Sequence, residues 1–300
     1  MISAMYENGG NTTHRFLDGH PQLFVYPFES QLGTRRVSDH LSSMFPLKYR
    51  WPEFALDASA FDDYREIIDE EGKVRARTPQ VSKFRNIDFD MIDDERGSIY
   101  RRIVEREGRS RATNVAAFFR ATFEAWHNFK SSGQEEMYVG YSPIIVVDAE
   151  KIAADFPNAH IVHIVRNPWS AYAETKKRAV PLGIEHYMSA WTMVQYYAML
   201  AASKRPERVH ILRFEDIIAD PENVLGSLCD KLALQRHAAI SKPSWNSTPI
   251  EEVYPWGTIR HPTAQANVER ASELDPSERE EITLRARPFL DAFRYTDELS

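Results

Sequence analysis

Arg166 has the setting in this sequence that most clearly suggests chemistry. It directly follows the apolar run of residues 161–165, which is long enough for one strand buried on both faces. Asn167 then offers a helix N-cap, and Pro168 stands at the favoured first helical position. A guanidinium at the carboxyl end of a strand, beside a helix start, is a suitable receptor for phosphate. The alternative is an arginine in a structural ion pair.

A second candidate lies near the N-terminus, where the mostly apolar residues 1–6 lead into Glu-Asn-Gly-Gly-Asn-Thr-Thr at residues 7–13. The two glycines permit the sharp turn and close backbone approach that phosphate binding needs, and the threonines can begin a helix over residues 14–19. This is not a Walker sequence, because no Gly-Lys-Ser/Thr follows. Gly-Gly-Asn is also a common turn without a ligand.

Glu29 is the first candidate for a general base. It ends the hydrophobic, aromatic residues 22–28, which we expect to form a connection after a helix that ends at His20. A carboxylate in that setting is partly desolvated, which would raise its pKa and suit it to accept a proton near neutral pH. A surface glutamate is the alternative. His20 and the Glu185-His186 pair are further candidates, although His20 also suits capping or packing at the helix end.

The elements that would position these residues predict an α/β fold. Strands and helices alternate over residues 137–234, which indicates three layers, a parallel sheet with helices on both faces. We expect strands at residues 137–141, 161–165 and 209–214, and helices at residues 114–129, 148–156, 185–204, 221–234 and 275–293. We expect a loop followed by an amphipathic helix at residues 32–49, and a loop at residues 241–265.

Length and composition favour one domain. A chain of 300 residues with 43% hydrophobic residues can bury one large core, so we expect a single domain over residues 1–300. Residues 50–112 carry dense, mixed charge and no phosphate-type motif. We interpret them as a helical and loop insertion that shapes an acceptor site, and a plain solvated face is the alternative.

Charge and cysteine content exclude several classes of protein. A net charge of −7 argues against a general nucleic-acid binder. The single cysteine, Cys229, excludes an internal disulfide and a thiolate zinc site, and it fits a reducing compartment. The sequence has neither an apolar run of about 20 residues for a membrane span nor a signal-peptide pattern. We therefore expect a cytoplasmic protein without a bound metal, and the sequence indicates no particular oligomeric state.

Three separated segments together resemble the sulfotransferase family, whose members use 3′-phosphoadenosine 5′-phosphosulfate (PAPS). Ile-Val-Arg-Asn-Pro at residues 164–168 resembles the family's 3′-phosphate-binding motif. Arg-Phe-Glu-Asp-Ile at residues 213–217, with the Asp-Pro that follows, resembles its Tyr-Glu-Asp-Leu element. Arg-Phe-Leu-Asp at residues 15–18, with the next His-Pro, is similar to the helix end after its 5′-phosphosulfate loop.

The resemblance covers residues 1–33 and 137–234, and it implies a P-loop NTPase-like sulfotransferase fold. The implied reaction is transfer of a sulfuryl group from PAPS to a hydroxyl of a small-molecule, glycan or lipid acceptor, without a metal. The product nucleotide would be 3′-phosphoadenosine 5′-phosphate (PAP), and Glu29 would be the base, as in some branches of the family. The implied nucleotide-binding residues are Gly9, Gly10, Asn11, Thr12, Thr13, His14, Arg15, Arg166, Thr175 and Arg260.

The sequence departs from the family at two positions. The basic residue of the family's 5′-phosphosulfate loop falls on Glu7 without a gap, and a two-residue gap supplies the threonine pair but still no lysine. The candidates for the missing positive charge are His14, Arg15, Arg35 and Arg36. Eight residues beyond Arg166, Glu174 replaces the family's serine, so the hydroxyl role passes to its neighbour Thr175.

The missing lysine leaves a second interpretation, a non-catalytic nucleotide-binding or scaffold protein on the same fold. A third is an ATP-dependent P-loop kinase. The kinase interpretation is disfavoured because Gly-Lys-Ser/Thr is absent. It is retained as an alternative because Glu215-Asp216, directly after an expected strand, could bind magnesium.

Overall fold

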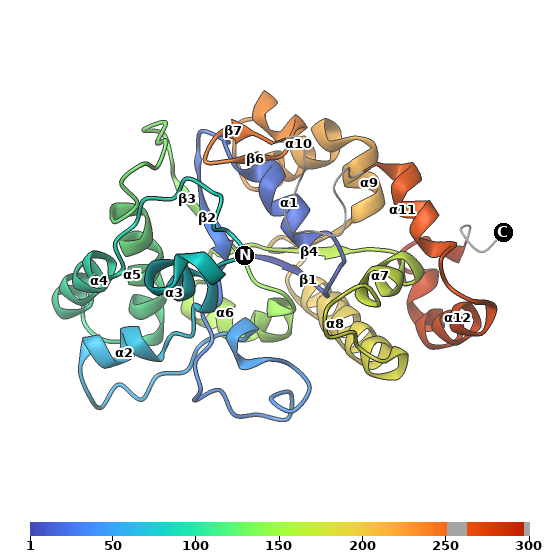
Figure 1. Cartoon of the computed structure of the whole chain (residues 1–300), viewed down its shortest axis with the longest axis horizontal. Helices are drawn as coiled ribbons and strands as arrows, with labels where there is room; N and C mark the ends of the chain where they lie inside the picture. Colours follow the sequence, from blue (N-terminus) through green and yellow to red (C-terminus); the bar gives the residue numbers. More distant parts are fainter. Residues whose placement is uncertain (251–262, 297–300) are drawn as a thin grey trace.

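The computed structural model describes residues 1–250 and 263–296. At its centre lies a parallel sheet with the strand order β2-β3-β1-β4-β5 (Figure 1). The strands are β1 (Ile2–Ala4), β2 (Leu23–Glu29), β3 (Met137–Tyr141), β4 (Ile161–Val165) and β5 (Val209–Arg213). A short antiparallel pair, β6 (Ser244–Trp245) and β7 (Thr248–Pro249), forms a separate small sheet.

Helices cover both faces of the sheet (Figure 1). One face carries α1 (Gly10–Leu17), α9 (Phe214–Ala219) and α10 (Pro221–Lys231), and the other carries α6 (Ala149–Asp155) and α8 (Ile184–Lys204). Each face has its own cluster of buried apolar side chains. The predicted three-layer α/β arrangement is therefore confirmed.

The remaining helices lie at the two sides of the sheet. Beside β4 and β5, α7 (Pro168–Thr175) packs against α11 (Ala264–Ala271), and α12 (Pro276–Leu290) packs against α8. Beyond the β2 edge lie α2 (Ala60–Glu66), α3 (Glu70–Arg77), α4 (Asp93–Glu107) and α5 (Arg111–Glu124) (Figure 1). None of the helices within the described residues is both long and apolar enough to span a membrane.

Strand β4 has the two buried faces that its uninterrupted apolar run predicts. Val162 and Ile164 join the cluster beneath α1, whereas Ile161 and Val165 join the cluster on the opposite face. Successive side chains of a strand point to opposite faces, so a central strand needs apolar residues at every position. The one polar residue, His163, hydrogen-bonds to Gln195 of α8 at 3.0 Å.

Several predicted helix starts are confirmed by their caps. Asn167 accepts a hydrogen bond from the Ser170 N–H at 2.8 Å and begins α7. Asp220 caps α10 in the same way. Asp275 and Glu278 form a capping box at the start of α12. Short polar side chains at these positions satisfy the N–H groups that a first helical turn leaves unpaired.

Three segments differ from the prediction, and one of them is the predicted loop of residues 241–265, whose described part contains β6, β7 and the start of α11. Residues 22–28 belong to strand β2 rather than to a connection, because β2 lies at the sheet edge, where Pro27 need not donate to a neighbouring strand. The pairing of β2 with β3 is irregular between Val25 and Glu29. Residues 32–49 contain turns and one 3-10 turn, Leu47–Tyr49, instead of an amphipathic helix.

The region of residues 50–112 contacts the sheet through buried polar groups. Tyr26 of β2 donates its hydroxyl to Asp69 at 3.1 Å, and Asp69 also pairs with Arg96 of α4 at 2.7 Å. All three side chains are buried, so each polar group needs its partner inside the protein. These contacts hold α3 and α4 beside the end of β2.

Candidate functional site

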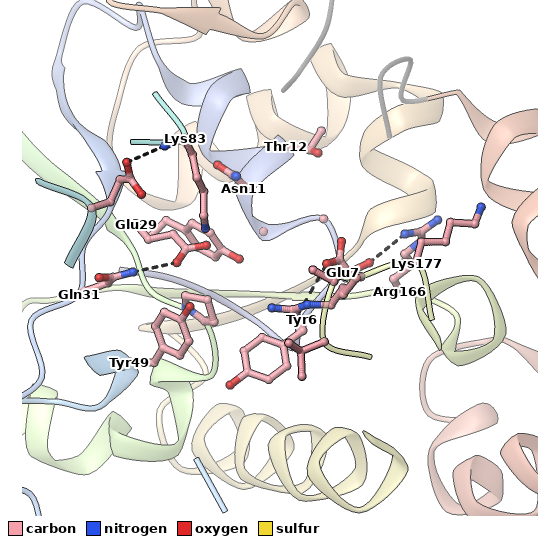
Figure 2. Close-up of a pocket in the computed structure, with 18 of the residues that line it drawn as sticks. Tyr6, Glu7, Asn11, Thr12, Glu29, Gln31, Tyr49, Lys83, Arg166 and Lys177 are labelled. Atoms are coloured by element: carbon pink, nitrogen blue, oxygen red, sulfur yellow. Dashed lines mark hydrogen bonds and ion pairs between the residues drawn. The ribbon is translucent and has the colours of Figure 1, made fainter. Parts of the chain in front are cut away.

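A cavity of about 630 Å³ opens at the carboxyl edge of the sheet. Glu7 follows β1, Glu29 ends β2, Tyr141 ends β3 and Arg166 follows β4, and all four line this cavity (Figure 2). The carboxyl ends of parallel strands meet at one edge, and open α/β sheets bind their ligands there. The cavity is therefore the candidate functional site.

The turn between β1 and α1 forms one wall of the cavity. Gly9 has a φ of +85°, and a Cβ atom on it would lie 2.1 Å from the Phe214 ring. A Cβ atom on Gly10 would lie 2.5 Å from the Tyr141 ring. Side chains are therefore excluded at both positions, and α1 begins at Gly10 with its free N–H groups at the turn. Such a helix start is suited to hold an anion.

Arg166 is fully buried at the same wall, next to the turn. Its Nη1 donates to the Glu7 carbonyl at 2.8 Å, and its Nε donates to Asn267 Oδ1 at 2.5 Å. Nη2 has no hydrogen-bond partner among the described residues. Burial lowers the pKa of Arg166, and the charge of Glu215 is the largest opposing influence. A buried N–H group without a partner is unfavourable, so Nη2 is a ready donor for an anion.

The Asn8 side chain stabilises this wall through hydrogen bonds to three parts of the chain. Its Oδ1 accepts from the Arg166 backbone N–H at 3.1 Å and from Trp191 Nε1 at 3.2 Å. Its Nδ2 donates to the Tyr6 carbonyl at 2.8 Å and to the Tyr187 hydroxyl at 3.1 Å. One buried amide thus joins the β1 turn, the end of β4 and helix α8. Sequence reasoning missed this residue, since its partners are distant in the chain.

Glu29 lies at the opposite end of the cavity and is half-buried. Gln31 Nε2 donates to its carboxylate at 3.3 Å. Burial, followed by the negative charge of Glu29, raises the pKa of the Tyr49 hydroxyl well above its usual value. The Lys83 side chain extends into the cavity toward Glu29 (Figure 2). This end therefore presents a carboxylate and an ammonium group to the same space.

Comparison with known proteins decides the family. The model of the sulfotransferase family matches residues 8–238. The chain belongs to the sulfotransferase family. This membership supports sulfuryl transfer as the general reaction. A separate search of curated proteins found no match.

Two solved sulfotransferase domains have a similar fold. The domain from the olefin synthase of Synechococcus PCC 7002 is 16% identical, with a TM-score of 0.51, and the match covers 96% of this chain and 93% of that one. The domain from the curacin biosynthetic pathway is 15% identical, with a TM-score of 0.54 and coverage of 95% and 96%. At this identity the likeness concerns the fold, and the predicted sulfotransferase fold is confirmed.

Five of the nucleotide-binding residues expected of a sulfotransferase line the cavity with Glu29: Gly9, Gly10, Asn11, Thr12 and Arg166. Arg260 lies outside the described residues. Thr13 and Thr175 are buried away from the cavity, and each donates its hydroxyl at 3.0 Å to the carbonyl four residues earlier in the chain. These bonds are typical of threonines inside or beside a helix.

The residues proposed to replace the missing lysine of the β1 turn also lie outside the cavity. His14 is fully buried, and burial lowers its pKa well below 6.5, so the ring is neutral. Arg15 donates to the Tyr26 carbonyl at 3.0 Å and lies over the Trp245 ring. Arg35 and Arg36 are exposed and are not among the residues that line the cavity. Helix α1 begins at Gly10, so His14 and Arg15 lie one turn beyond the cavity wall, and neither residue lines the cavity.

Three other cations line the cavity, and sequence reasoning singled out none of them: Lys83, Lys177 and Arg178. Lys177 pairs with Glu273 at 2.7 Å, and Arg178 pairs with Glu7 at 3.8 Å. Within the described residues, Lys83 forms no ion pair. These residues come from segments without a recognisable motif, so only the folded chain brings them to the site.

The other candidate bases lie outside the cavity, and the exposed Glu185 and His186 at the start of α8 do not line it. His20 donates a ring N–H to the Gln235 carbonyl at 2.8 Å and accepts from the Gln22 N–H at 3.2 Å, outside the cavity. Glu174, at the serine position, is fully buried and pairs with Arg270 of α11 at 2.6 Å. The departure at Glu174 is therefore matched by a cation on a helix that the sequence analysis did not predict.

Proposed function

We propose that this protein transfers a sulfuryl group from PAPS to a hydroxyl group of a small-molecule, glycan or lipid acceptor. The observation that carries the proposal is the buried Arg166 guanidinium beside the glycine turn at the start of α1, because its Nη2 has no hydrogen-bond partner in the described part of the chain. In this proposal Arg166 receives the 3′-phosphate. The turn and the first N–H groups of α1 receive the 5′-phosphosulfate. The residues present fit such a nucleotide because the cavity is lined both by the Arg166 guanidinium and by the glycine turn at the start of α1.

Glu29 takes the role of general base. When bound, the donor supplies the sulfuryl group and a phosphate that leaves. The acceptor oxygen bonds to sulfur as the bridging bond to that phosphate breaks, and the acceptor proton passes to a Glu29 carboxylate oxygen. Gln31 holds the carboxylate in position through its hydrogen bond. Placement of the reacting groups in line contributes much of the rate acceleration in this class of transfer.

Lys83 supplies the positive charge that the β1 turn lacks. Its side chain extends into the cavity, and it has no competing ion pair among the described residues (Figure 2). An ammonium group near the transferring sulfuryl oxygens stabilises negative charge in a partly desolvated space. The region of residues 50–112 then contributes to the reaction as well as to the shape of the acceptor site. We assign it as an insertion within one sulfotransferase domain over residues 1–300 of a cytoplasmic enzyme.

The alternative function is nucleotide binding without transfer, which the absence of a lysine in residues 7–13 favours. One pair of measurements separates the two. Isothermal titration calorimetry with PAP and with adenosine 5′-phosphate should give much tighter binding of PAP, because adenosine 5′-phosphate lacks the 3′-phosphate. Incubation with radiolabelled PAPS and a panel of alcohols and phenols should then yield a labelled acceptor. Equal affinity for the two nucleotides would contradict the proposed site, and binding without any transfer or hydrolysis would favour the alternative.

A further inference from the structure

Asn267 of α11 stands between Arg166 and Glu215, and both ends of its amide are in use. Its Oδ1 accepts from Arg166 Nε at 2.5 Å, and its Nδ2 donates to Glu215 Oε1 at 3.0 Å. The residue is only 2% exposed. A neutral amide therefore bridges a buried cation and a nearby carboxylate that do not contact each other directly.

Glu215 is itself held by several donors. Its Oε1 accepts from the Asn167 backbone N–H and from Asn167 Nδ2, both at 3.0 Å, in addition to Asn267. Its Oε2 accepts from the Tyr295 hydroxyl at 2.9 Å. The carboxylate thus ties the start of α7 to α11 and to the end of the described chain. It has a structural role that does not require a bond to Arg166.

Direct pairing of Glu215 with Arg166 would weaken the anion site. Opposite charges attract strongly where water is excluded, and a guanidinium that already holds a carboxylate has fewer N–H groups and less net charge for a phosphate. The Asn267 amide oxygen accepts from Nε, and Nη2 next to it has no hydrogen-bond partner within residues 1–250 and 263–296. Its position separates the two charges while satisfying a donor on one and an acceptor on the other.

We propose that Asn267 is a positioning residue of the donor site, which orients Arg166 and prevents Glu215 from neutralising it, so that Arg166 stays open to a phosphate group. This inference rests on the proposed function, because the phosphate in question is the 3′-phosphate of the donor nucleotide. Helix α11 then belongs to the nucleotide site although no sequence motif marks it.

A role of Asn267 in packing alone is the competing explanation. Other contacts already hold α11 against α7: the Asn267 carbonyl accepts from Ser170 Oγ at 2.5 Å, and Arg270 pairs with Glu174 at 2.6 Å. Among the described residues, the side-chain amide forms hydrogen bonds only with the two charged residues, Arg166 and Glu215. Its replacement should therefore change recognition of the 3′-phosphate more than the docking of the helix.

The test compares the affinities for PAP and adenosine 5′-phosphate by calorimetry, because their ratio isolates the 3′-phosphate. Asn267→Leu removes both hydrogen bonds without adding charge, and Asn267→Asp keeps the shape but places a carboxylate on Arg166. We expect either change to reduce the preference for PAP by roughly 10- to 100-fold, while the affinity for adenosine 5′-phosphate stays within about twofold. Gln265→Leu, on the exposed side of the same helix, is the matched control and should change neither affinity.

A double variant gives the decisive readout. If Glu215 neutralises Arg166 once the amide is gone, then Glu215→Gln added to Asn267→Leu should restore most of the preference for PAP. In the unmodified background, Glu215→Gln should not increase that preference, since Asn267 already separates the charges. An unchanged preference in both single Asn267 variants, or the lack of recovery in the double variant, would overturn the inference. If the unmodified protein itself shows no preference for PAP, the proposed function fails first.

Discussion

The two ends of the cavity are built differently. At one end, Arg166 is fully buried, and its partners come from the β1 turn and α11. At the other end, Glu29 is half-buried and Lys83 is exposed, and their surroundings come from the edge strand β2 and from residues 50–112. The first end is buried and has one guanidinium nitrogen without a partner in the described part of the chain, whereas the second end carries the half-buried Glu29 and the exposed Lys83.

This difference suggests a division of labour between the ends. A buried site held by many hydrogen bonds is preorganised, so little ordering is needed when its ligand binds. That property suits a donor nucleotide, which is common to all members of a transferase family. The open end, made by an edge strand and an added helical region, suits an acceptor that differs from one enzyme to the next. The predictions that follow separate binding at the first end from turnover at the second.

The largest expected effect is at Arg166. Arg166→Ala removes the charged donors of the buried end, and each such bond contributes roughly 1.5–3 kcal/mol. We expect PAP affinity to fall by roughly 1,000-fold, while the affinity for adenosine 5′-phosphate changes far less, as measured by calorimetry. Arg166→Lys keeps the charge but loses the planar fork, and should show an intermediate loss. Undiminished PAP binding in Arg166→Ala would remove Arg166 from the proposed site.

Glu29 should show the opposite pattern. Glu29→Gln keeps the size of the side chain but removes the proton acceptor, so turnover should fall by roughly 100- to 1,000-fold. PAP affinity should stay within about twofold, because Glu29 lies at the other end of the cavity from Arg166. The measurement is steady-state transfer of labelled sulfate beside calorimetry with PAP. Near-normal turnover would exclude Glu29 as the base.

The buried end could be predicted from sequence because its signals are local. The strand of residues 161–165, the cap Asn167 and Pro168 fall within a few positions of Arg166, so strand and helix patterns place the arginine without tertiary information. The glycine turn before α1 is equally local. Here the family resemblance and the physical pattern agreed, and the structure brought both segments to one cavity.

The open end and α11 could not be predicted in the same way. Lys83 enters the cavity because Tyr26, Asp69 and Arg96 hold the 50–112 region beside β2, and those contacts join residues far apart in the chain. Asn267 reaches Arg166 across 101 positions of sequence. Nothing in the spacing of either residue marks a ligand, so the sequence alone assigns neither of them to the site.

A smaller effect is expected at Lys83, which lines the same end of the cavity as Glu29. Lys83→Ala should lower turnover by roughly 10- to 100-fold, since an ammonium group that stabilises developing charge is lost, and PAP affinity should hold within a few-fold. Lys83→Arg should retain part of the activity. Arg35→Ala, an exposed arginine outside the cavity, is the matched control. If Arg35→Ala lowers turnover and Lys83→Ala does not, the missing charge comes from the residues after β2 instead.

The smallest expected effect concerns His14, which the structure makes neutral. Burial, and then the positive charge of Arg15, lower the pKa of His14 well below 6.5. Near pH 6 the His14 ring therefore binds a proton more readily in the unfolded chain than in the folded protein. Stability is therefore highest above pH 6.5 and falls on acidification. In urea unfolding between pH 7.5 and 5, His14→Gln should flatten this dependence by about 1 kcal/mol per pH unit. An unchanged slope in His14→Gln would mean that the folded protein protonates this ring, and His14 would return as a source of positive charge beside the β1 turn.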